Sequence, residues 1–198
     1  MKRGTKILAF AAVLAIMLAG SGRAQDPAPA QTEESRMPGP QHKILAAFEG
    51  NWNNTVLFWP DASVTEPYQS KGKNTNYWVL GGRFLYQESR GAPIQGNEDK
   101  LESIGITGYD SAAAAYVSTR MDNRGTGMKI STGTYDATRR TIYETGTINL
   151  PEGKKADFRA EWHSVDSDRY TYELFLKGPD GKEYPSLQIV YDKQPVNP

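Results

Sequence analysis

Short stretches in which apolar and polar residues alternate fill most of the chain after Gly50. In one of them Phe158, Ala160 and Trp162 occupy every second position, and the residues between them are polar or charged. Successive side chains of a β-strand point to opposite faces, so the pattern predicts strands with one dry and one wet face. Ten strands are predicted, over about residues 51–59, 74–80, 83–90, 101–109, 115–122, 127–135, 141–149, 156–163, 169–177 and 184–191.

The segments between these stretches are short and rich in residues that reverse the chain direction. Examples are Asp110-Ser-Ala112, Asp136-Ala-Thr138 and Pro179-Asp-Gly181. Such connections join antiparallel neighbours, and a long sheet built in this order exposes two unpaired edges unless it closes. We therefore predict an all-β protein, an antiparallel up-and-down barrel of about ten strands. A two-sheet sandwich is the alternative architecture.

A different pattern precedes the first strand, between Pro40 and Gly50. Proline is accepted in the first turn of a helix, and glycine commonly follows the last turn. The apolar residues between them form one helical stripe: Ile44, Leu45, Ala47 and Phe48. A helix of about ten residues is marginally stable alone, so we predict that it packs over one mouth of the barrel.

The N-terminal region has the form of a secretory signal peptide, with basic residues first, an apolar run from Ile7 to Ala19, and small residues up to Ala24. The run is shorter than the roughly 20 apolar residues that cross a bilayer. We predict a signal peptide over residues 1–24, a flexible Pro- and Ala-rich tether over 25–40, and a single barrel domain over 41–198. The mature protein would be periplasmic or secreted, with no membrane span.

Composition narrows the chemistry further. The chain has no cysteine, which excludes disulfides, thiolate metal sites and a lipid-anchored N-terminus. Without the four basic residues of the predicted signal peptide, 19 basic residues face 23 acidic ones. A mildly acidic protein without a basic stripe gains little from contacts with phosphates, so we expect no nucleic-acid partner. The pattern also points to no metal site and no cofactor.

Several motifs together resemble a bacterial family known only as a domain of unknown function, DUF1579. Gly50-Asn-Trp52 also resembles the Gly-x-Trp opening of lipocalins. The other matching stretches are Trp78-Val-Leu-Gly-Gly-Arg-Phe-Leu85, Gly108-Tyr-Asp110, Tyr116-Val-Ser-Thr119, Gly133-Thr-Tyr-Asp136 and Gly178-Pro-Asp-Gly-Lys-Glu183. The resemblance implies a lipocalin-like barrel in which Trp52 is buried beside the helix, and it brings no established activity. It also implies acids at Glu88, Asp122 and Glu173, whereas Arg120 stands where the family more often has tryptophan.

Three other features have a structural and a functional interpretation. Gly81-Gly-Arg83 is read as a hairpin turn that needs positive φ, the alternative being an anion-binding loop. His163 is read as a polar residue on the wet face near a strand end, and His42 as a surface residue. The alternative for His163 is an acid/base or a haem or metal ligand.

Arg120 and Asp122 share one face of a predicted strand. A buried pair of this kind could orient a polar ligand, but Met121 is the better core candidate, so we expect the pair to face solvent. The many aromatic residues could either line a cavity or fill a solid barrel. Our candidate ligand-binding residues are Arg120, Glu88, Glu173, Trp78, Tyr86 and Tyr143.

These observations favour an exported, non-enzymatic binding module for a small hydrophobic or amphipathic molecule. One alternative is an enzyme on a small exported substrate that uses Glu88, Asp122 or His163 as acid/base. No Ser-His-Asp or Cys-His arrangement is recognisable, so no catalytic residue is assigned. The other alternative is a solid barrel that binds another protein through its outer face or tether. The volume of the cavity distinguishes the binding module from the solid barrel.

Overall fold

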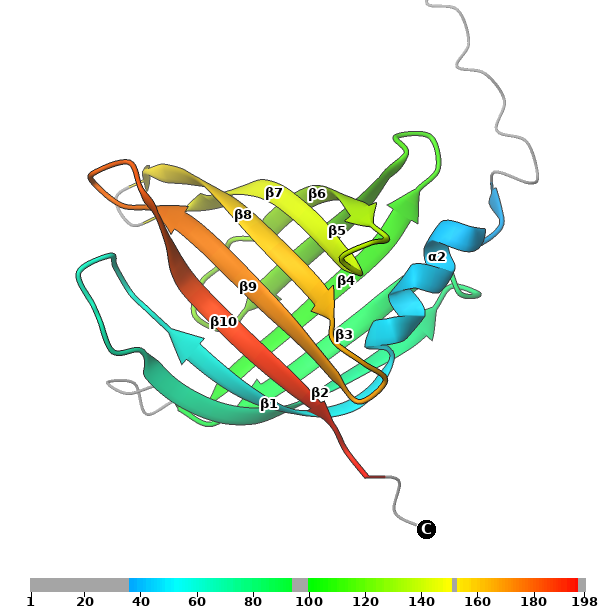
Figure 1. Cartoon of the computed structure of the whole chain (residues 1–198), viewed down its shortest axis with the longest axis horizontal. Helices are drawn as coiled ribbons and strands as arrows, with labels where there is room; N and C mark the ends of the chain where they lie inside the picture. Colours follow the sequence, from blue (N-terminus) through cyan, green and yellow to red (C-terminus); the bar gives the residue numbers. More distant parts are fainter. Residues whose placement is uncertain (1–35, 94–99, 151–152, 196–198) are drawn as a thin grey trace, which may run out of the picture. The chain divides into compact units, whose positions relative to one another are not determined.

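The structure is a computed structural model that describes residues 36–93, 100–150 and 153–195. These residues form a short helical segment, α2 (Pro40–Ile44) and the 3-10 helix η1 (Leu45–Phe48), followed by strands (Figure 1). The strands are β1 (Gly50–Phe58), β2 (Tyr68–Val79), β3 (Phe84–Gly91), β4 (Leu101–Asp110), β5 (Ala115–Asp122), β6 (Lys129–Asp136), β7 (Thr141–Asn149), β8 (Lys155–Ser164), β9 (Arg169–Lys177) and β10 (Glu183–Lys193). The predicted signal peptide lies outside the described residues.

The ten strands form one closed barrel. Each strand pairs antiparallel with the one before it, and β10 returns to pair with β1, where Trp52 lies opposite Lys193 and Phe58 opposite Leu187. Closure leaves none of these strands with an unpaired edge. The lipocalin-like barrel is thereby confirmed, and the sandwich is not formed.

The strand positions agree with the alternation pattern except at β2, which begins at Tyr68, well before the predicted start. This added part contains Lys71, Gly72 and Lys73, which offer no apolar alternation to recognise. It is a strand because β1 supplies backbone partners along its whole length, from Gly50 opposite Asn76 to Phe58 opposite Tyr68. Pairing with a neighbour overrides the weak local signal.

Aromatic side chains fill the end of the barrel where β1 begins. Trp52 and Tyr170 are fully buried and meet edge to face with their ring centroids 4.7 Å apart, and Tyr170 stacks on Tyr191 at 4.1 Å. The Trp52 indole N–H donates a hydrogen bond to the Phe48 carbonyl at 3.1 Å. Trp52 therefore gains packing area while its indole N–H keeps a partner. Trp52 is buried beside the helical segment, as predicted.

The helical segment closes this end of the barrel (Figure 1). It is one short α-helix that tightens into a 3-10 helix, not the continuous helix predicted from Pro40 to Gly50. Residues three apart are aligned in a 3-10 helix, so Leu45 and Phe48 both point into the barrel and are 1% and 3% exposed. Ala47, predicted in the same apolar stripe, is exposed.

His42 is buried, with 7% of its surface exposed, so its predicted surface position is wrong. Its Nδ1 accepts a hydrogen bond from the Gly39 backbone N–H at 3.1 Å, and its ring packs edge-on against Tyr109. The His42 side chain thus satisfies a backbone donor at the start of α2. The alternation of polar and apolar residues does not reveal such a capping contact. Burial and the nearby charge of Arg83 lower the pKa of His42.

The Gly81-Gly-Arg83 segment is a hairpin turn between β2 and β3, as predicted. Leu80, Gly81 and Gly82 have φ values of 50°, 68° and 81°. The guanidinium of Arg83 is bound by backbone carbonyls of the protein itself, because it donates to those of Leu80 and Arg36 at 3.1 and 2.9 Å.

Among the described residues, no helix has the length and apolar character needed to cross a membrane.

Candidate ligand-binding site

The barrel contains a cavity of about 460 Å³ at the end opposite the helical segment. It is lined by residues near the ends of β1, β3, β5, β7 and β9 and near the starts of β4, β6 and β10. The lining residues are Asn54, Val56, Phe58, Ser89, Gly91, Leu101, Ser103, Arg120, Asp122, Arg124, Lys129, Ile148, Leu174, Leu176, Ser186, Leu187 and Ile189. This volume is within the usual range of small-molecule sites, about 300 to 1,000 Å³.

One wall of the cavity is apolar. It is built from inward-facing residues of β1, β9 and β10, among them Val56, Leu174, Leu176 and Ile189. Phe58 is the aromatic side chain of this lining. Apart from Phe58, the apolar residues of this lining are therefore aliphatic, whereas Trp52, Tyr170 and Tyr191 fill the closed end.

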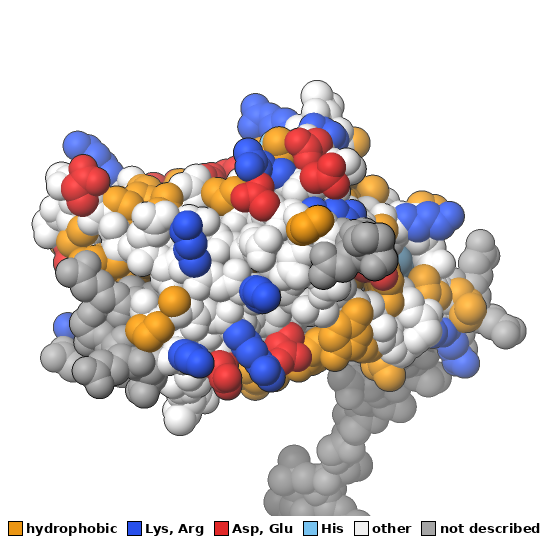
Figure 2. Space-filling view, turned by 90° about the horizontal axis from the view of Figure 1, so that it is seen from below, with side chains coloured by type: hydrophobic (Ala, Val, Ile, Leu, Met, Phe, Trp, Pro, Cys, Tyr) orange, Lys and Arg blue, Asp and Glu red, His pale blue; other side chains and the backbone are white. Residues whose placement is uncertain are grey.

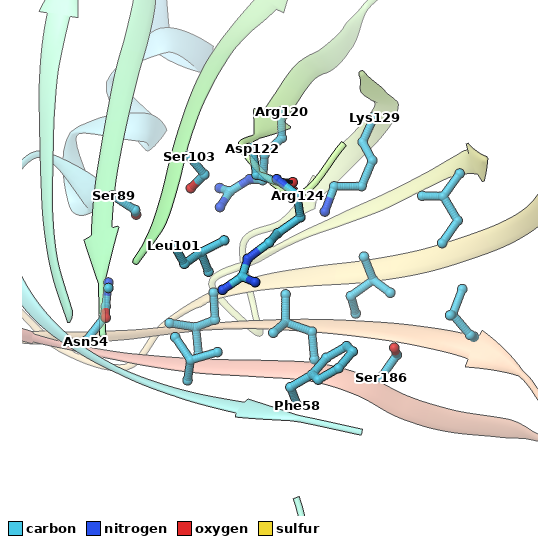
Figure 3. A pocket seen from close by; sticks show the side chains of 17 residues that line it. Asn54, Phe58, Ser89, Leu101, Ser103, Arg120, Asp122, Arg124, Lys129 and Ser186 are labelled. Carbon is cyan, nitrogen blue, oxygen red and sulfur yellow. Dashed lines mark hydrogen bonds between the residues drawn. The ribbon is translucent and has the colours of Figure 1, made fainter. Parts of the chain in front are cut away.

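The facing wall carries charged side chains from β5, β6 and the loop between them. Figure 3 shows Arg120, Arg124 and Lys129 reaching into the cavity from this side, with Phe58 and Ser186 on the other side. Asp122 is the acid in this lining, and its Oδ1 accepts a hydrogen bond from the Arg124 backbone N–H at 3.0 Å. The lining thus holds three basic groups and one acidic group.

The orientation of β5 corrects the prediction that Arg120 and Asp122 face solvent. Tyr116 and Ser118 of this strand are buried, so the residues in phase with them point inward and Met121 points outward. Tyr116 holds this face inside the barrel: it is 1% exposed, and its hydroxyl donates to the Gln41 carbonyl at 2.9 Å. The apolar residues Val117 and Met121 had favoured burial of the opposite face of β5, which points outward.

The guanidinium of Arg120 makes its direct contacts with neutral groups inside the barrel. Its guanidinium carbon lies 5.2 Å from the ring centroids of both Trp162 and Tyr172, within range of a cation–π interaction. Its Nη2 donates to the Gln87 side-chain oxygen at 3.3 Å. Burial raises the pKa of Tyr172 and Tyr191 although the Arg120 charge opposes this, so both phenols stay protonated near neutral pH.

Lys129 is half-buried on the first residue of β6, opposite Arg120. Burial, together with the charge of Arg120, lowers the pKa of Lys129 to about 8, although Asp122 acts in the other direction. Both causes penalise the charged amine. The site therefore contains an ammonium group whose charge is incompletely compensated.

A small polar chamber lies beside Arg120, toward the closed end. Its carboxylate is Glu144, which is 2% exposed and accepts hydrogen bonds from Ser118 at 2.5 Å and Ser131 at 3.0 Å. Trp162 also lines this chamber, and its indole N–H has no hydrogen-bond partner among the described residues. Sequence reasoning missed Glu144, although the alternation Ile142, Glu144, Gly146 on β7 carries the signal.

Hydrogen-bonded amides lead from the cavity to the closed end. Ser89, which lines the cavity, donates to Asn74, and Asn74 donates to Asn76 at 2.5 Å. Asn76 in turn donates to the Phe48 carbonyl at 2.6 Å and the Tyr170 hydroxyl at 3.0 Å. Their mutual bonds satisfy these amides, so burying them inside the barrel is not destabilising.

Of the six candidate ligand-binding residues, the structure brings Arg120 to the cavity. Tyr86, Glu88, Tyr143 and Glu173 lie out of phase with the buried residues of their strands and face the outside of the barrel. Glu88 pairs there with Arg90 at 2.8 Å, and Glu173 accepts from Gln188 at 2.5 Å. Trp78 packs on the core near the closed end, where its N–H donates to Glu49 at 3.1 Å.

The residues named for an enzymatic alternative do not come together. Asp122 lines the cavity, whereas Glu88 is outside the barrel on β3 and His163 is outside it on β8, where its Nδ1 lies 3.0 Å from the Thr141 hydroxyl. Neither histidine lines the cavity, so an imidazole cannot ligate a haem bound there. No group of His, Asp and Glu suited to a metal ion occurs within the described ranges.

The outer surface is different in charge pattern from the cavity wall. Figure 2 shows one outer face, on which basic and acidic side chains are scattered among polar ones. Ion pairs join Arg159 to both Glu161 and Glu183 and join Arg169 to Asp192. Arg159 and Arg169 outside the barrel thus form ion pairs, whereas Arg120 and Lys129 form none with the described residues.

Barrel, closing helix and internal cavity define a lipocalin-like protein. The chain belongs to the DUF1579 family, described as a protein of unknown function, whose model matches residues 37–193. No curated protein matches it in sequence.

Two solved structures are similar in fold. Rv2717c from M. tuberculosis has a TM-score of 0.58 and 16% sequence identity, over 80% of this chain and 100% of that one. The S-type phycobiliprotein lyase CPES from Guillardia theta has a TM-score of 0.58 and 8% identity, over 83% of this chain and 97% of that one. At these identities the likeness concerns the fold, and the chemistry must be argued from the site.

Proposed function

We propose that this protein is a non-enzymatic carrier or sensor that binds one small amphipathic molecule inside its barrel after export. The observation that carries the proposal is the two-sided lining of the 460 Å³ cavity, with aliphatic residues on one wall and basic residues on the other. A molecule with an apolar body and a polar end satisfies both walls at once. A purely polar solute would leave the leucine and isoleucine wall in contact with water.

The dense packing of the closed half indicates that the aliphatic residues of the cavity serve ligand binding and are not needed as a second core. Aromatic rings and the helical segment already provide a dense core there, with Trp52, Tyr170 and Tyr191 at most 1% exposed. The cavity-lining aliphatic residues are therefore an additional apolar surface. Each methylene group that a ligand buries against them contributes about 0.8 kcal/mol.

The fold shared with a phycobiliprotein lyase is compatible with a small-molecule role, but it does not identify the ligand. The geometry gives less support to catalysis, because Asp122 has no histidine or second carboxylate beside it in the cavity lining. Export rests on the N-terminal sequence pattern. Edman sequencing of protein recovered from the periplasm or medium should begin near Gln25, and an uncut chain in the cytoplasm would contradict export.

The binding proposal is tested by filling the cavity. A fluorescent fatty-acid analogue titrated into the wild-type protein should bind saturably, with a negative heat-capacity change in calorimetry because apolar surface leaves water. Ile189→Trp places a large side chain in the cavity and should weaken binding at least about tenfold. Val190→Trp, one position along β10 and facing outward, is the matched control and should bind like wild type.

Thermal melting of both variants shows whether they are folded. Saturable binding that Ile189→Trp leaves unchanged in a folded protein would place the ligand outside the barrel. Absence of binding by any apolar probe would contradict the proposed function and favour the alternative of an interaction module.

A further inference from the structure

We propose that the polar end of the ligand is an anion, a carboxylate or a phosphate ester, held between Arg120 and Lys129. This inference rests on the proposed function and specifies the chemical class that the cavity accepts. Its basis is the arrangement of charge on the polar wall.

Two basic side chains of the cavity lining, Arg120 and Lys129, form no ion pair with any of the described residues. Asp122 is the acidic residue of this lining, and it accepts a hydrogen bond from the backbone of Arg124, which orients part of its carboxylate toward its own loop. Glu144 is the acidic residue of the adjacent chamber, and two serine hydroxyls already bind its oxygens.

Arg120 is a cation whose direct contacts include no acidic group among the described residues. Its contacts within the described structure are two aromatic rings, the Gln87 amide and the Tyr191 hydroxyl, all of them neutral. A charge removed from bulk water is costly unless it is paired. A guanidinium presents a planar array of donors that matches the two oxygens of a carboxylate or phosphate.

Lys129 provides a second, independent observation. It lies opposite Arg120 across the β5–β6 pair and is half-buried, so two positive groups face one small volume. The effect of burial and of Arg120 on its pKa shows that these two charges oppose each other. An anion placed between them turns that repulsion into two attractions.

The geometry also places the rest of the ligand. Leu174 and Leu176 of β9 and Ile189 of β10 line the same cavity, on strands that pair with neither β5 nor β6. An aliphatic chain that leaves the anion toward these residues stays inside the barrel. The matching ligand is a medium-chain amphiphile with one anionic end.

The test compares three probes that share one tail: dodecanoate, dodecyl phosphate and dodecanol, titrated calorimetrically into the full chain near pH 7. We expect both anions to bind at least about tenfold tighter than the alcohol, because hydrogen bonds between charged groups are stronger than those of a neutral hydroxyl. The ratio between the two anions tells whether the site prefers a carboxylate or a phosphate. Inorganic phosphate alone should bind far more weakly than dodecyl phosphate.

Arg120→Met keeps the aliphatic stem and removes the charge. It should weaken both anions about 10- to 100-fold and leave dodecanol within about threefold of wild type. Arg90→Met, outside the barrel on β3, is the matched control and should change neither affinity. Lys129→Met with Lys71→Met, the latter exposed on β2, makes a second pair that stays informative if Arg120→Met does not fold.

The outcomes separate the two proposals. If dodecanol and the anions bind equally, and neither Arg120→Met nor Lys129→Met changes that ratio, the anion site is wrong while the binding function stands. If no probe binds to the wild-type protein, the binding function itself is wrong. Selective loss of the anions in both variants supports the assignment.

Discussion

The guanidinium of Arg120 lies over the indole ring of Trp162, with 5.2 Å between the guanidinium carbon and the ring centroid. Trp162 belongs to the aromatic core of the closed end, where its ring meets Phe48 and Tyr172. The contact therefore joins the densely packed half of the barrel to the half that contains the cavity. This contact positions the guanidinium of Arg120, because the Trp162 ring beneath it is itself packed in the core.

Trp52→Ala should lower the free energy of unfolding by about 3 to 5 kcal/mol, the usual loss for a buried large aromatic. Trp52 is fully buried and contacts Tyr170, and its hydrogen bond to Phe48 links β1 to the helical segment. Denaturant unfolding at constant m value measures the change. Trp78→Ala, at the edge of the core, should cost less, and a loss below about 1 kcal/mol for Trp52→Ala would contradict the proposed packing.

His42 should make the protein less stable in mild acid. Because the folded-state pKa of His42 is lowered, the unfolded chain takes up its proton first, and stability falls as the pH drops below about 6.5 toward the folded-state pKa. Protonation of Nδ1 also breaks the hydrogen bond from Gly39. His42→Gln keeps an acceptor at the third position of the helix and should flatten this part of the stability profile.

Melting temperatures between about pH 5 and pH 8 measure the effect of His42. The difference between wild type and His42→Gln should be largest at the acid end of this range. An equal slope in both proteins would show that other groups cause the acid sensitivity.

Lys129 should destabilise the unliganded protein and make anion binding dependent on pH. Its folded-state pKa of about 8 lies below the ordinary value of 10.5, so its contribution to stability is greatest above about pH 10.5 and is lost as the pH falls through about 8. Lys129→Met should therefore stabilise the empty barrel near pH 7, by on the order of 1 kcal/mol because the side chain is only half-buried.

Anion affinity has the opposite dependence. The charged groups that face Lys129 are Arg120 and Asp122 of β5 and Arg124 of the adjoining loop, with Glu144 of β7 in the chamber nearby. As Lys129 loses its proton above about pH 8, dodecanoate affinity should fall while dodecanol affinity stays constant. Calorimetry at pH 7 and pH 9 tests this, and equal dodecanoate affinities would exclude Lys129 from the site.

Glu144→Gln should strengthen anion binding about 2- to 10-fold, because it removes a buried negative charge near Arg120. The amide oxygen can still accept from Ser118 or Ser131, so the barrel should fold. The neutral alcohol should bind as before. An unchanged dodecanoate affinity would show that the Glu144 charge does not reach the ligand.

Alternation along the strands and the turn residues between them predicted ten antiparallel strands, because both are local consequences of the strand repeat and of backbone preference, and the need to protect the sheet edges favoured a barrel over a sandwich. The burial of Trp52 was implied by the resemblance of Gly50-Asn-Trp52 to the lipocalin opening, and the structure confirms it. These features depend on neighbours in the sequence, and they could be predicted.

The orientation of β5 depended on the tertiary structure. Both of its faces carry candidates for burial, Val117, Thr119 and Met121 on one and Tyr116, Ser118 and Arg120 on the other, so the pattern alone is ambiguous. The carbonyl of Gln41 in α2 binds the Tyr116 hydroxyl inside the barrel, and Arg120 enters the cavity on the same face of β5. Strand register in a closed barrel is a long-range property: one strand's phase determines which side chains share the lumen, and only the assembled barrel brings Arg120, Lys129 and the aliphatic wall together.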